Sequence, residues 1–200
     1  MEDVTDIEIG GYRFTDPALL ENALTHSSYL HEHPEQNAPD FERLEFLGDA
    51  VVDLVVGEEL YRRFPDATEG ELTALRAALV SSAALAEVGR QLGLPERARL
   101  GRGEEETGGR SRAGLAASLY ESVVGACYIE SGLAAASALV QRTMGDAIAE
   151  TVSSPRKSPK TLLQEWAQAA HHPLPLRKLA EGGQQIDPVG RGVEAVVTSR

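Results

Sequence analysis

The 200-residue chain is poor in several residue types, and each shortage excludes a class of protein. Its single cysteine, Cys127, cannot form an internal disulfide, and its helix-like surroundings predict a buried, inert thiol. His26 has no second histidine at a metal-binding spacing, which predicts a hydrogen-bonded structural residue. No apolar run reaches the ~18 residues of a membrane span, and the acidic start MEDVTDIEIG does not resemble a signal peptide. We therefore expect a cytoplasmic globular protein without a membrane partner.

Positive charge is also scarce. The net charge of −12 by itself argues against a nucleic-acid partner. Its distribution weakens that objection, because residues 1–150 hold 12 Lys+Arg against 27 Asp+Glu (−15), whereas residues 151–200 hold 7 against 4 (+3). We interpret the chain as a carboxylate-rich body suited to metal, joined to a mildly basic arm that contacts phosphate.

Alternating apolar and polar strands are almost absent from the body, whereas helical periodicity recurs. The predicted helices cover residues 17–29, 43–64, 69–80, 83–92, 114–131 and 133–151. The segment GRGEEETGGRSR at 101–112 is rich in glycine and charge, which predicts an irregular surface loop. These patterns predict an all-α domain over residues 1–150.

Four carboxylates fall within roughly 80° of one another on the helix predicted within residues 41–57, at ~100° per residue. They are Glu42, Glu45, Asp49 and Asp53. Apolar residues interleave with them, and unpaired buried carboxylates are costly unless a cation compensates them. The pattern therefore predicts a divalent metal site. The alternative is an exposed helix edge whose acids pair with Arg43, Arg62 and Arg63.

Several segments carry a family resemblance in chain order. They are LTHSSY (24–29), ERLEFLGD (42–49), RRFPDATEGELTALR (62–76), LGRGEE (100–105), GGR (108–110) and LAASLYESVVGACYIESG (115–132). Together they cover roughly residues 10–150 and resemble the ribonuclease III family, for which the octapeptide ERLEFLGD is highly specific.

The resemblance implies a ribonuclease III-type helical endonuclease domain. Its expected activity is the magnesium-dependent hydrolysis of double-stranded RNA, with Mn²⁺ as a substitute ion. The family works as a homodimer in which each of two sites cuts one strand and leaves a 5′ phosphate. Processing of ribosomal and other RNA precursors is the expected role.

The resemblance also implies site residues. Glu45 matches a metal ligand, Asp49 a catalytic ligand and Glu121 the essential glutamate of a second helix. Glu45 and Asp49 stand at i and i+4, ~6 Å apart at their base, so both can reach one ion. Ser118 stands where the family has an aspartate and can hold an ion through water at best, which leaves a catalytically weakened RNA-binding or regulatory homologue as the alternative. Asp53 is expected to be solvated or a loop partner rather than a compensating ligand.

Other residues match supporting positions of the family. Glu42 and Glu69 match supporting acids, although Glu69 is equally typical of a helix start. Phe46 matches an aromatic of the dimer interface, with core packing as the alternative. Arg110 and Arg112 are candidates to contact RNA phosphates, or else belong to a surface loop without that role.

The end of the chain resembles a second module. Residues 151–158 read as a linker, and residues 159–168 (PKTLLQEWAQ) resemble the first helix of a double-stranded-RNA-binding domain. Lys157 and Lys160 are its candidate RNA contacts. Residues 159–200 are too few for the complete α+β module, so we expect a truncated domain and weak duplex binding by this arm.

Overall fold

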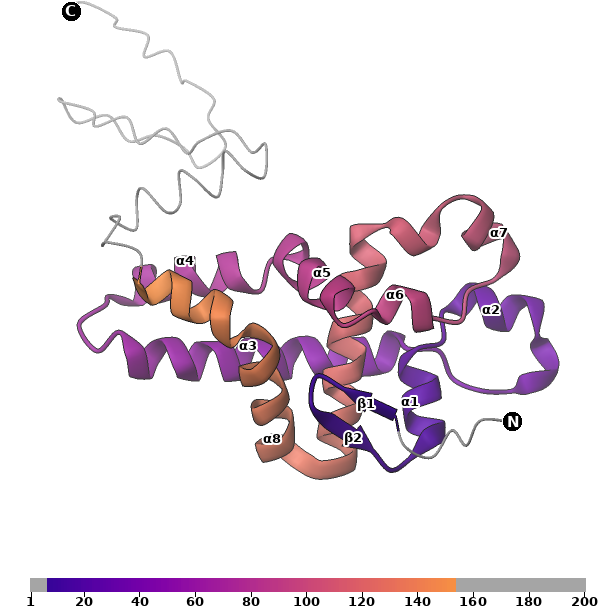
Figure 1. Cartoon of the computed structure of the whole chain (residues 1–200), viewed down its shortest axis with the longest axis horizontal. Coiled ribbons are helices and arrows are strands. Elements are labelled where there is room, and N and C mark those ends of the chain that lie inside the picture. Colours follow the sequence, from indigo (N-terminus) through magenta and orange to yellow (C-terminus); the bar gives the residue numbers. More distant parts are fainter. Residues whose placement is uncertain (1–6, 154–200) are drawn as a thin grey trace, which may run out of the picture.

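The computed structural model describes residues 7–153, which form a helical body with one short hairpin (Figure 1). The elements in chain order are β1 (Ile7–Ile9), β2 (Tyr12–Phe14), α1 (Pro17–Ala23), α2 (Ser27–Glu32), the 3₁₀ turn η1 (Pro34–Gln36), α3 (Glu42–Arg63), α4 (Glu69–Leu79), α5 (Ser82–Gln91), α6 (Leu94–Arg97), α7 (Arg102–Glu106), the 3₁₀ turn η2 (Gly109–Ser111) and α8 (Ala113–Ser153).

The predicted helices at 43–64, 69–80 and 83–92 are confirmed as α3, α4 and α5. The single helix predicted over 17–29 is wrong. The chain breaks at Thr25, whose backbone bridges to Arg99, and His26 then caps a new helix, α2. The helices predicted at 114–131 and 133–151 are the two halves of α8, which bends at Gly132, where φ is 76°.

The body is mostly helical, as predicted, with two local departures from expectation. The body is not purely helical, because β1 and β2 pair in antiparallel register with Ile9 opposite Tyr12. Their turn uses Gly10 and Gly11 at φ values of 56° and 76°, which glycine adopts without strain. The segment at 101–112 is not irregular either, since it holds α7 and η2. Contacts with α2 and α6, described below, supply the order that its composition alone does not predict.

The core is organised around α8, whose first half crosses α3 and also packs on α5 (Figure 1). Glycines make these crossings close. A Cβ at Gly48 of α3 would collide with the backbone carbonyl of Glu121, and a Cβ at Gly125 would collide with that of Leu44. A Cβ at Gly89 of α5 would likewise collide with Ala116. Backbone therefore meets backbone where α3 and α8 cross, which sets their acidic positions side by side.

Burial accounts for the apolar character of α8. Its stretch Ala113–Ala149 is long and apolar enough to cross a membrane by length and composition alone, yet 44% of the tested window is buried inside the body. Leu119, Val123 and Val124 are fully buried. Such a helix is typical of a domain core. The buried thiol predicted at Cys127 is confirmed, and burial raises its pKa to about 11.

The helix α8 continues to Ser153, through the first three positions of the segment expected to be a linker at 151–158. The rest of that linker, the truncated RNA-binding module predicted at 159–200 and its candidate contacts Lys157 and Lys160 lie outside the described residues.

Candidate metal centre at the crossing of two helices

The start of α3 is fixed by its neighbours. The Phe41 N–H donates to the Thr25 carbonyl at 2.9 Å, and the Asp40 carboxylate accepts the Glu42 N–H at 3.1 Å. Phe41 is buried and its ring lies against the His26 imidazole, with 5.6 Å between centroids. The first turns of α3, which carry the predicted acids, are therefore tied to the chain just before α2.

Four carboxylates share one electrostatic environment at the α3–α8 crossing. The pKa of Glu121 is raised to about 7, mainly by burial and then by the charges of Asp49, Glu45 and Asp53, in that order. A carboxyl group with three negative neighbours and little solvent resists ionisation. The structure therefore brings together the predicted residues Glu45, Asp49 and Glu121. It adds Asp53, for which a solvated role had been expected.

The carboxylates of these four acids lack compensating partners within residues 7–153, where none of the four forms a side-chain hydrogen bond or an ion pair. Arg62 and Arg63, the partners expected for an exposed helix edge, instead pair with Glu58 and Glu59 one turn earlier, at 2.7 and 2.5 Å. Pairing with these two arginines is therefore not how the acids are balanced. The repulsion among them is unrelieved by protein groups in the described body.

The donor set suits a hard divalent cation. The cluster offers only carboxylate oxygen. The partly buried Ser118 stands three residues before Glu121 on α8, so its position lies on the same face of that helix. Oxygen ligands are those that Mg²⁺ and Mn²⁺ prefer. In the described part of the chain, no three Asp, Glu, His or Cys side chains converge closely enough to enclose an ion. An ion would therefore be held partly through water, as Mg²⁺ commonly is.

The two supporting acids lie apart from this cluster. Neither Glu42 nor Glu69 is among the charges that raise the pKa of Glu121. Glu42 is exposed at the first residue of α3. Glu69 opens α4 and accepts a hydrogen bond from Thr73 at 2.9 Å, beside a capping box formed by Thr68 and Glu71. The geometry of Glu69 is that of a helix start.

Phe46 does not pack in the core of the described body. Its side chain is 81% exposed, on the helix that carries Glu45 and Asp49. Leu54 and Tyr61 of α3 are also exposed, at 54% and 73%. Large apolar side chains along one helix are typical of an interaction surface.

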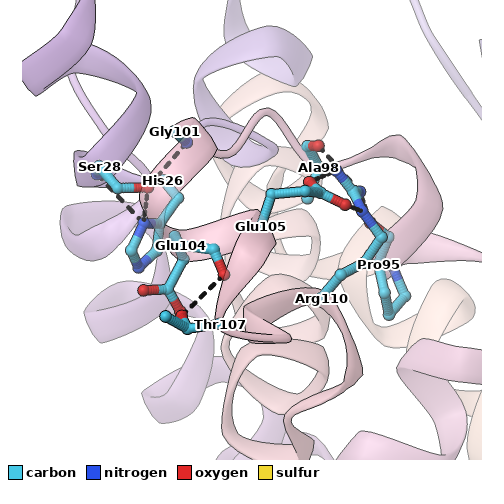
Figure 2. Close-up of polar contacts among 9 residues, drawn as sticks. All are labelled: His26, Ser28, Pro95, Ala98, Gly101, Glu104, Glu105, Thr107 and Arg110. Atoms are coloured by element: carbon cyan, nitrogen blue, oxygen red, sulfur yellow. Dashed lines mark hydrogen bonds and ion pairs between the residues drawn. The ribbon is translucent and has the colours of Figure 1, made fainter.

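Arg110 and Arg112 both bind groups of the protein itself, and Figure 2 shows the contacts of Arg110. Arg110 pairs with Glu105 and donates to the carbonyls of Pro95 and Ala98. Arg112 pairs with Glu104 at 2.6 Å and donates to the Thr107 hydroxyl at 3.1 Å. Contact of either residue with RNA stays a prediction.

The structural role predicted for His26 is confirmed. Its Nδ1 accepts the Ser28 N–H at 3.1 Å and lies 2.7 Å from the Ser28 hydroxyl.

Sequence reasoning missed the glycines that build the site. Gly48 and Gly125 lie inside long helices, where glycine costs roughly 0.5–1 kcal/mol relative to alanine. These glycines could have predicted the helix crossing, because an interior glycine in a helix often marks the close approach of another backbone. Their contact carries Glu121 to the acidic face of α3.

Comparisons with known proteins agree on one family. The family model described as Ribonuclease-III-like matches residues 16–148. The chain is 43% identical over 183 residues to Ribonuclease 3 of Alkalilimnicola ehrlichii, covering 90% of this chain and 77% of that protein. It is 45% identical over 169 residues to Ribonuclease 3 of Pseudothermotoga lettingae, covering 82% and 71%.

Solved structures give the same result. The nuclease domain of ribonuclease III from Campylobacter jejuni, described for flexibility in a region involved in dimer formation, superposes with a TM-score of 0.64 at 37% identity. That match covers 68% of this chain and 92% of the other. Dicer from Pichia stipitis matches with a TM-score of 0.52 at 25% identity, over 72% of this chain and 61% of that one.

Proposed function

The chain belongs to the ribonuclease III family and is an endonuclease of double-stranded RNA, and we propose that a magnesium centre at the α3–α8 crossing carries its reaction. In this proposal Glu45, Asp49 and Glu121 hold the ion, with Mn²⁺ as a substitute. The cellular role is processing of ribosomal and other RNA precursors in the cytoplasm.

The observation that carries the proposal is the unpaired carboxylate cluster. Glu121 has a pKa raised to about 7 by burial and by three acids of α3, and no protein cation in the described body offsets them. A bound magnesium ion would neutralise charge on the scissile phosphate and favour a nucleophilic water. Asp49 is exposed and adjacent, so its carboxylate is the group we assign to orienting that water and accepting its proton.

Ser118 should weaken the binding of magnesium at this centre without abolishing it. Its hydroxyl brings no negative charge, so the ion is attracted by fewer acids than in relatives with an aspartate there. A hydroxyl still donates to and accepts from a bound water. We therefore propose weaker magnesium affinity with activity retained.

The homodimer is the second part of the proposal. Phe46, Leu54 and Tyr61 leave an apolar stripe exposed on α3, the helix that carries three of the acids. A second copy of the chain would cover this stripe and place two centres on one duplex. Duplex RNA is then recognised by its shape and backbone, because its deep major groove admits few side chains.

One further candidate function has a specific observation in its favour. Ser118 in place of an acid is consistent with a homologue that binds duplex RNA without cutting it. Incubating a long perfect RNA duplex, and its separate strands, with Mg²⁺, Mn²⁺ or a chelator distinguishes the two functions. We expect cutting of the duplex only, with either ion, and products that carry 5′ phosphates. Binding without cutting across a wide magnesium range would favour the regulatory homologue.

A further inference from the structure

The segment 101–112, which joins α6 to α8, is a built structure held at both ends. At its first end it is docked on α2. The Gly101 N–H donates to the Ser28 hydroxyl at 2.9 Å, and the Gly103 N–H donates to the Glu32 carboxylate at 3.4 Å. The backbone N–H of Arg102 is the main cause that lowers the pKa of Glu32. A Cβ at Gly101 would collide with the Ser28 carbonyl, so only glycine permits this approach.

At its second end the segment is held by Arg110 (Figure 2). The Nε and one terminal nitrogen of Arg110 donate to the two oxygens of Glu105, at 2.8 and 2.5 Å. The other terminal nitrogen donates to the carbonyl of Pro95 and, at 3.1 Å, to that of Ala98. Pro95 lies in the first turn of α6 and Ala98 directly follows the helix, and both are buried. Arg110 therefore joins α7, η2 and α6 through one side chain.

Backbone hydrogen bonds connect this segment to both helices of the metal centre. The connection to α3 runs through Arg99, two residues before the segment. The Arg99 N–H donates to the Leu24 carbonyl at 2.8 Å, and the His26 N–H donates to the Arg99 carbonyl at 3.0 Å. Thr25, between Leu24 and His26, accepts the Phe41 N–H just before α3. On the other side the Arg112 carbonyl accepts the Ala116 N–H in the first turn of α8, at 3.3 Å. A shift of the segment would therefore disturb the starts of α3 and α8 together.

The two arginines of the segment differ in how many hydrogen-bond donors remain unused. A guanidinium has five N–H donors. Arg110 directs four of them at Glu105, Pro95 and Ala98, and its side chain is 28% exposed. Arg112 directs two at Glu104 and Thr107 and is 54% exposed. Arg112 thus has donors to spare for a phosphate, whereas Arg110 is almost fully engaged inside the protein.

We propose that Arg110 is a positioning residue of the nuclease site, which clamps the segment 101–112 onto α6 and so aligns the starts of α3 and α8, rather than a ligand of RNA phosphate. The proposal rests on the proposed function for its catalytic consequence. It assigns Glu105 to the same clamp, because the bidentate pair orients the guanidinium toward the carbonyls of α6.

Four variants separate the two roles of Arg110: Arg110→Ala, Arg110→Lys, Glu105→Ala and the matched neighbour Arg112→Ala. Three quantities are measured. Amide hydrogen exchange of residues 101–116 is followed without metal. Duplex affinity is measured with a chelator as a function of salt. Cleavage of saturating duplex is measured as a function of magnesium.

If Arg110 clamps the segment, Arg110→Ala and Glu105→Ala should shift the exchange rate, kcat and the magnesium midpoint in the same direction. Each should speed exchange of the segment by about tenfold or more, since a charge-assisted hydrogen-bond network is lost. Each should lower kcat and raise the magnesium concentration at half-maximal rate, while the salt slope of binding stays that of the parent. Arg110→Lys should not rescue exchange, because an ammonium cannot make the bidentate pair. Arg112→Ala should lower the salt slope by about one.

A phosphate ligand predicts the opposite pattern, which would overturn the proposal. Arg110→Ala would then lower the salt slope, Arg110→Lys would preserve binding, and Glu105→Ala would tighten binding by freeing the arginine. An unchanged magnesium midpoint with a lower kcat would also overturn it, since loss of folded protein alone has that effect. If Arg110→Ala does not fold, the same measurements on Arg110→Lys and Glu105→Ala distinguish a clamp from a phosphate ligand. If the parent does not cut duplex, the proposed function fails, while exchange and salt slope still decide whether Arg110 clamps the segment.

Discussion

Replacing Glu121 by glutamine should make the metal-free protein more stable at neutral and alkaline pH. The parent carboxylate is partly buried at the α3–α8 crossing and faces the charges of Asp49, Glu45 and Asp53. Glutamine keeps the shape of the side chain and removes its charge. The cost of burying this charge, which is the main cause of the raised pKa, and the repulsion from the three acids are therefore both absent in Glu121→Gln.

The magnitude follows from the pKa of Glu121. Its rise from 4.5 to about 7 corresponds at full strength to about 3 kcal/mol, at ~1.4 kcal/mol per pH unit. Solvent reaches the rim of the site and screens the repulsion, so we expect a gain of about 1–2 kcal/mol in the free energy of unfolding.

The gain depends on pH with a defined sign. Because the folded pKa of Glu121 is raised, the folded parent binds more protons than the unfolded chain between pH 4.5 and about 7, and its stability falls as pH rises through that range. Glu121→Gln should therefore differ little from the parent at pH 4.5 and reach its full gain above pH 7. Urea unfolding with a chelator at pH 5 and pH 8, at one protein concentration, measures this difference.

Glu130, on the same helix α8, provides a matched control of opposite sign. Burial raises its pKa, but hydrogen bonds from the Tyr12 hydroxyl and from the Asp16 and Thr15 N–H groups outweigh burial and lower it. Its stabilisation is present above the unfolded pKa and is lost as pH falls through the folded one. Glu130→Gln should thus destabilise at pH 5 and at pH 8. A Glu121→Gln variant no more stable than the parent at pH 8, or equally stabilised at both pH values, would refute the reasoning.

Three further predictions concern ligand charge, assembly and packing. Ser118→Asp should lower the magnesium concentration at half-maximal cleavage by restoring a charge next to Glu121; an unmoved midpoint would contradict a role for this position at the ion. Phe46→Glu should shift the parent dimer toward monomer in sedimentation at micromolar concentration, and a parent that is already monomeric would exclude the assigned interface. Gly48→Ala should cost about 2–3 kcal/mol in urea unfolding, because its methyl collides with a backbone carbonyl. Gly70→Ala, which meets open space, should stabilise by about 0.5–1 kcal/mol, and equal effects at both glycines would contradict the close crossing.

Local patterns in the sequence predicted the long helices well. The acids of α3 recur with a period that only a helix places on one face, and apolar residues on its other sides predicted a covered helix. Thr68 and Glu71 form the capping box of α4 within two residues of the predicted start. Such features depend on neighbours a few positions apart, so the chain itself contains the information.

Contacts between distant segments were not predictable in the same way. The order of α7 depends on Ser28 and Glu32, about 70 positions earlier, and on the carbonyls of α6. The hairpin β1–β2 is three residues per strand, too short for an alternating pattern to stand out. Arg110 is almost fully engaged inside the protein and Arg112 is not, because of the carbonyls that lie near Arg110. The composition of the segment does not predict this difference.

The site was predicted in part because of its period and its family resemblance. Glu45 and Asp49 lie close enough to Glu121 for their charges to raise its pKa, and so does Asp53, for which a solvated role or a loop partner had been expected. Binding of an ion by these residues stays a prediction. The closeness of Glu121 to the three acids is set by Gly48 and Gly125, which no periodicity marks as partners.

Cleavage by Glu121→Ala tests the central claim most directly. The variant and the parent are given a perfect RNA duplex in excess magnesium under single-turnover conditions, and duplex binding is measured in parallel with Ca²⁺. We expect the cleavage rate to fall by at least about a hundredfold, as for loss of a metal ligand, with binding and folding close to those of the parent. Cutting by the variant at the parent rate would show that the carboxylate cluster is not the centre of the reaction.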